Sequence, residues 1–153
     1  MINVSRLVDS IVDNLRAIPE LVALMQGRDE SIFAYHDLYP DRNSLTLEIT
    51  KLLPGQMMVA WTGTTPSSGM GYWNHSIKIY ARAIEEPSNG AAPDSYYEIV
   101  RLVFDGVPAG QSLTMRQIEF LDFCDPMANE NVFRSSDIEG IDHFEIDLTF
   151  TER

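Results

Sequence analysis

Histidines are the first residues in this chain that could bind a metal or act in acid–base catalysis. His36, His75 and His143 lie far apart, and none has the H-x-x-H or H-E-x-x-H spacing of a zinc site. His75 alternates in phase with apolar residues, which favours a histidine satisfied inside the core. Asp142 and Glu145 flank His143, but a strand would direct residues 142 and 143 to opposite faces. The sequence therefore predicts no metal site.

Three further motifs come close to a binding or catalytic pattern and miss it. Asp137–Asp142 resembles a calcium loop, but Ile141 stands where an oxygen ligand is needed. The segment Gly63–Gly69 continues with Met70, whereas a Walker A loop is G-x-x-x-x-G followed by Lys. The acidic neighbours of Cys124 disfavour a reactive thiolate. We therefore expect no catalytic residue, no cofactor and no metal, and hence no enzyme.

Charge restricts the classes of partner. The chain of 153 residues has a formal net charge of −12, and from Glu119 to Glu152 ten acids stand against one base, Arg134. Direct binding to nucleic acid or to an anionic membrane needs clustered Lys and Arg, so we expect neither. The acidic segment itself is typical of a solvated surface. A charged amphipathic start, a single cysteine and the lack of a long apolar run favour a soluble protein made inside the cell.

The elements that would position these residues begin with two alternating segments. His143–Thr151 is apolar at every second position, which is the period of a half-buried strand. Trp73–Ala83 alternates in the same way. Together with the short apolar run Met57–Trp61 it predicts a β-hairpin with a long loop at about 62–71.

Charged residues on the polar sides of these strands suggest which strands are neighbours. Lys78 and Arg82 share the polar face of one strand, and Glu145 and Asp147 share that of the other. Opposite charges that face each other across two strands contribute roughly 0.2–1 kcal/mol per pair. We predict that the terminal strand lies beside the strand that contains Lys78.

Helical spacing of apolar residues is clearest at the start of the chain. Val4–Leu15 forms one amphipathic stripe, and Pro19 suits the first turn of a second, short helix over Glu20–Gln26. Ser95 and Glu98 have the S-x-x-E spacing of a capping box. They predict a further helix whose buried face contains Ile99, Val100, Leu102 and Val103.

The remaining segments are less regular. Residues 28–43 are mixed and turn-rich, and residues 45–53 have helical spacing. Residues 107–140 are poorly patterned, apart from a short strand predicted over 118–123. The order of helices, hairpin, helix and terminal strand predicts one domain over residues 1–153. Its expected fold class is α+β, with helices packed on one face of a small, mainly antiparallel sheet.

Large side chains gather near the predicted hairpin loop. Trp61, Met70, Tyr72, Trp73 and Tyr80 are our candidates for a contact surface. Trp and Tyr are enriched at protein interfaces, and a flexible loop would let them adapt to a partner. The alternative, that Trp61 and Trp73 belong to the core, has at least equal weight.

Three features of the chain point to one family. They are the amphipathic opening helix, the stretch Leu53–Val59 leading to Trp73–Tyr80, and the ending Asp137–Ile146. In this layout, over nearly the full chain, the sequence resembles the tail-terminator (tail-completion) proteins of long-tailed bacteriophages. The resemblance implies a small α+β subunit that closes into a hexameric ring on the tail tube. Such a ring stops tube polymerisation and docks the tail to the neck of the filled head.

The resemblance also implies partners and a location. The partners would be further copies of the chain, the tail-tube protein and a neck or connector protein. The location would be the head–tail junction of the virion, after assembly in the host cytoplasm. A cyclic ring uses a heterologous interface, in which one face of each subunit meets a different face of the next. The acidic segment from residue 119 would then be a ring surface or a lumen wall.

Other functions stay open at this point. Within the virion, the rival is a head–tail connector or stopper protein of the same neck. From a different class, the rival is a small-ligand-binding module with Trp61, Tyr72 and Trp73 as pocket walls. An enzyme would need a cluster of the three histidines with nearby acids, which the sequence does not reveal.

Overall fold

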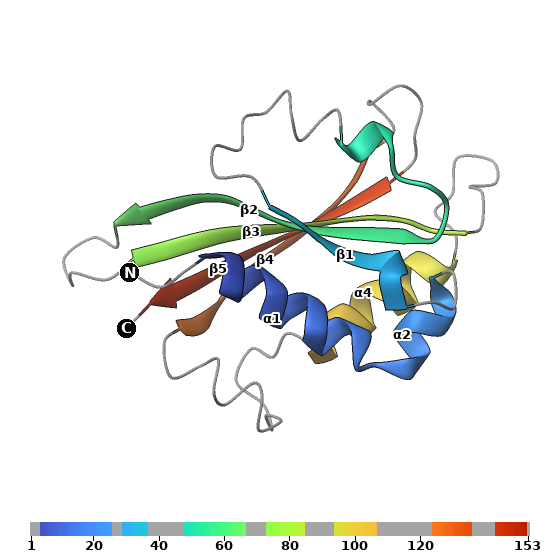
Figure 1. The fold of residues 1–153 in the computed structure, drawn as a ribbon, viewed down its shortest axis with the longest axis horizontal. Helices are drawn as coiled ribbons and strands as arrows, with labels where there is room; N and C mark the ends of the chain where they lie inside the picture. Colours follow the sequence, from blue (N-terminus) through green and yellow to red (C-terminus); the bar gives the residue numbers. More distant parts are fainter. Residues whose placement is uncertain are drawn as a thin grey trace.

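The computed structural model describes residues 4–25, 29–36, 48–66, 73–84, 94–106, 124–135 and 143–152. Three helices lie on one side of a long twisted sheet (Figure 1). The helices are α1 (Val4–Arg16), α2 (Pro19–Leu24) and α4 (Asp94–Gly106), with a short 3-10 turn, η1 (Asp29–Ser31). The strands are β1 (Ile32–Tyr35), β2 (Gln56–Pro66), β3 (Trp73–Arg82), β4 (Cys124–Ser135) and β5 (His143–Glu152).

The sheet has five strands in the order β1-β2-β3-β5-β4. Only β1 and β2 are parallel, and the other three neighbouring pairs are antiparallel. The predicted α+β fold with a mainly antiparallel sheet is therefore confirmed. The hairpin is confirmed as β2 and β3, and β5 lies directly beside β3 as predicted. The terminal strand thus occupies an inner position in the sheet.

The main core lies between the helices and one face of the sheet. Five residues of the apolar stripe of α1 are buried there, because they recur on one side of the helix: Leu7, Val8, Ile11, Val12 and Leu15. The strands contribute every second residue to the same core, which includes Ile77, Ile146 and Phe150. Each such side chain stabilises the fold by roughly 1.5–3 kcal/mol before conformational entropy is subtracted. This cluster is what holds the helices on one face.

A second, smaller cluster lies on the opposite face of the sheet. A single helical turn at residues 48–50 brings Ile49 and Leu52 over Met58 and Tyr80, with Ala60 beside them. Gly55 lets the chain turn from this segment into β2, because its φ of 84° is a conformation that side chains disfavour. Gly55 N donates to Arg82 O at 2.7 Å, which fixes the start of the hairpin.

Two strands were not predicted. β1 lies in a segment that the sequence presented as turn-rich, and β4 lies where an irregular polar stretch was expected. β1 is too short for an alternation to be visible. β4 contains Pro126 and breaks its register with β5 between Met127 and Asn131, so its sequence has no regular period. Pro is tolerated in β4 because this strand is at the edge of the sheet.

Several predicted boundaries were also wrong. β2 continues to Pro66, which pairs with Trp73, so the part of the expected loop at 62–66 is strand. Helix α4 begins at Asp94, which places Ser95 inside the helix and not at its cap. The Glu98 carboxylate pairs with Arg101 one turn later. The strand predicted over 118–123 and the loop tip at 67–72 lie outside the described residues.

Candidate functional site

The far end of the β2–β3 hairpin is organised by a bulge. The register between the two strands shifts between Trp61 and Gly63, which leaves Thr62 as an extra residue. Trp61 Nε1 donates to Thr64 Oγ1 at 3.0 Å, and Thr64 Oγ1 is 2.8 Å from Nδ1 of the fully buried His75. His75 is thus a satisfied core histidine, as predicted. These two contacts, from His75 through Thr64 to Trp61, set the position of the Trp61 indole.

The candidate contact residues end up in different environments. Trp61 is half-buried and packs against the main core. Trp73 begins β3 at the loop end of the hairpin, where it pairs with Pro66, and is 38% exposed. Met70 and Tyr72 lie outside the described residues. Of this set, Trp73 is the most exposed member among the described residues.

Tyr80 is not a surface residue. Its side chain is 4% exposed and belongs to the second apolar cluster, beneath Ile49 and Leu52. Its ring also lies near the buried His143, with 6.5 Å between ring centroids. The expectation that Tyr80 contributes to an exposed contact surface was therefore wrong. The reason is that the turn at 48–50 covers this part of the sheet, and the period of β3 alone could not reveal that cover.

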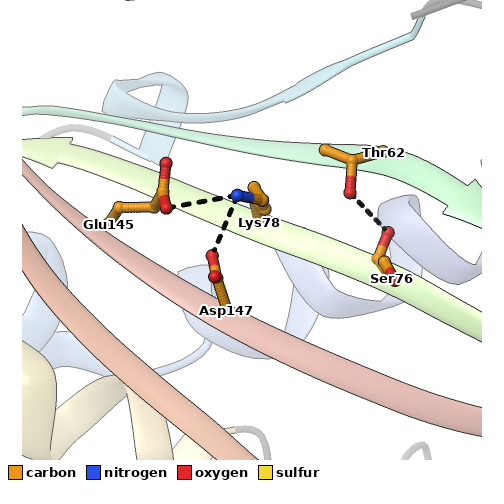
Figure 2. A network of polar contacts seen from close by, with 5 residues as sticks. All are labelled: Thr62, Ser76, Lys78, Glu145 and Asp147. Atoms are coloured by element: carbon orange, nitrogen blue, oxygen red, sulfur yellow. Dashed lines mark hydrogen bonds and ion pairs between the residues drawn. The ribbon is translucent and has the colours of Figure 1, made fainter.

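Beyond the second cluster, the face opposite the helices carries a compact charged group. Lys78 Nζ is 3.2 Å from Glu145 Oε2 and 3.5 Å from Asp147 Oδ1 (Figure 2). The three side chains are 22–33% exposed, so the group is partly shielded from water. Lys78 donates a hydrogen bond to Glu145, and its contact with Asp147 is a longer ion pair. The predicted charge pairing is confirmed for Lys78, whereas Arg82 donates to Leu52 O.

This charged group contains two acids and one base, and its electrostatics follow from that imbalance. Burial, and then the negative charge of Glu145, raise the pKa of Asp147, while Lys78 lowers it only partly. Burial also raises the pKa of Tyr80 strongly, with the two carboxylates adding to the shift. Tyr80 therefore stays protonated, and its hydroxyl hydrogen-bonds with Glu145. The lysine and the tyrosine together hold the carboxylate of Glu145.

Asp147→Asn is expected to raise the thermal stability of the chain at neutral pH. The native pKa of Asp147 lies above its usual 3.8, so the native state keeps this proton at a pH where the unfolded chain has lost it. The contribution of Asp147 to the free energy of unfolding therefore decreases as the pH rises from the ordinary pKa of an aspartate to the raised pKa of Asp147 in the folded chain. We expect a gain of up to about 1 kcal/mol at pH 7 that shrinks toward pH 4, measured by thermal unfolding across pH.

The control for this prediction is Glu145→Gln in the same strand. It weakens the 3.2 Å contact with Lys78 and should lower the stability, which is the opposite sign. Equal destabilisation by the two variants at pH 7 would contradict the prediction.

Chemistry-bearing residues are dispersed in the described structure. His36 Nε2 is 2.8 Å from Asp9 Oδ1, and both side chains are exposed. His75 is in the main core and His143 is on the opposite face of the sheet. In the described ranges, no three His, Cys, Asp or Glu side chains are grouped to hold a metal ion. Asp137–Asp142 lies outside these ranges, as do residues 67–69 of the glycine-rich segment.

Comparison with known protein families gives no match to the sequence, and no curated protein is significantly similar to it. None of the described helices has the length and apolar character needed to cross a membrane.

Sequence reasoning missed the link between Trp61, Thr64 and His75. The period of β3 placed His75 in the core, but the bulge at Thr62 changes the phase of β2 and brings Thr64 to the same face. Thr62 Oγ1 donates to Ser76 O at 3.3 Å beside the bulge (Figure 2). The one available signal was the weak strand character of Thr62–Thr65, which the sequence presented as a loop.

Proposed function

We propose that this chain is a structural virion protein, a tail terminator that closes into a ring on the tail tube and joins the tail to the neck of the head. The observation that carries the proposal is the asymmetry of the subunit. Helices cover one face of the sheet, a charged group occupies the other, and two unlike strands, β1 and β4, end the sheet. A cyclic ring needs such unlike surfaces, because each subunit contacts its two neighbours through different faces.

Charge and aromatic residues fit the same assembly. A net charge of −12 disfavours direct attachment to nucleic acid, as expected for a ring through which DNA passes. Trp73 is exposed at the end of the hairpin, at a distance in the sheet from the second apolar cluster. A half-exposed tryptophan is a suitable anchor for a second protein, here the tail-tube or the neck protein. Binding free energy is then the whole function.

The first test is the mass of the purified protein in solution, by light scattering and electron microscopy. We expect a hexameric ring of six 17.3 kDa chains, about 104 kDa in total. The ring should form alone or on addition of the tail-tube protein. A strict monomer under both conditions would contradict the proposal.

The second test is genetic. Deletion of the gene should give overlong or headless tails, since the tube then lacks its stop. Normal virions would contradict the terminator function. The protein on purified heads that lack tails would instead identify a connector or stopper of the neck.

A further inference from the structure

We draw no further inference here: the strongest candidate, the side-chain cluster of Lys78, Glu145 and Asp147 on the face of the sheet opposite the helices, belongs to the site already described, and nothing in the described residues shows what covers it.

Discussion

Phe150→Ala is expected to lower the free energy of unfolding by about 3–5 kcal/mol, the largest effect of any single substitution considered. Phe150 is 1% exposed and is among the largest fully buried side chains of the described residues. It lies on the apolar face of β5, opposite His75 of β3. Its removal leaves a cavity where β5 contributes to the main core, and the inner position of this strand in the sheet limits collapse around it.

The measurement is urea unfolding followed by circular dichroism. Thr149→Ala, one residue earlier on the half-buried opposite face, is the matched control and should cost less than about 1 kcal/mol. Phe150→Leu should fall between the two. If Phe150→Ala and Thr149→Ala cost the same, β5 does not bury its apolar face as described.

The second large effect is expected from Lys78→Met, with a loss of about 1–3 kcal/mol. Methionine keeps the apolar stem of lysine but removes the ammonium group. Glu145 and Asp147 would then face each other on the same side of β5 without a cation, while partly shielded from water. In a domain of this size such a loss lowers Tm by roughly 2–4 °C per kcal/mol.

Lys51→Met is the matched control because Lys51 also pairs with a glutamate, Glu48, at 3.0 Å. That pair is one turn apart on an exposed segment, where ion pairs contribute about 0–1 kcal/mol. The double variant Lys78→Met with Asp147→Asn should recover part of the lost stability, since one unpaired charge is removed. Equal effects of Lys78→Met and Lys51→Met would show that the sheet face does not shield its charges.

The charged group of Lys78, Glu145 and Asp147 could be predicted in part from the sequence. The two strands that contain it, β3 and β5, both have a clear period of two. That period placed Lys78, Glu145 and Asp147 on polar faces, and opposite charge suggested that the strands are neighbours. The period of two could not predict which other segments pack on this face of the sheet. The burial of Tyr80 depends on the turn at 48–50, which lies far from β3 and β5 in the sequence.

The sequence by itself determined the elements whose apolar residues repeat regularly: α1, the β2–β3 hairpin, α4 and β5. The spacing of apolar residues in these elements indicates that one face of each is buried, and this spacing can be read within each segment alone. Only the tertiary structure decided which strands end the sheet. β1 and β4 become strands because β2 and β5 offer them backbone partners, and such pairing leaves little trace in side-chain pattern.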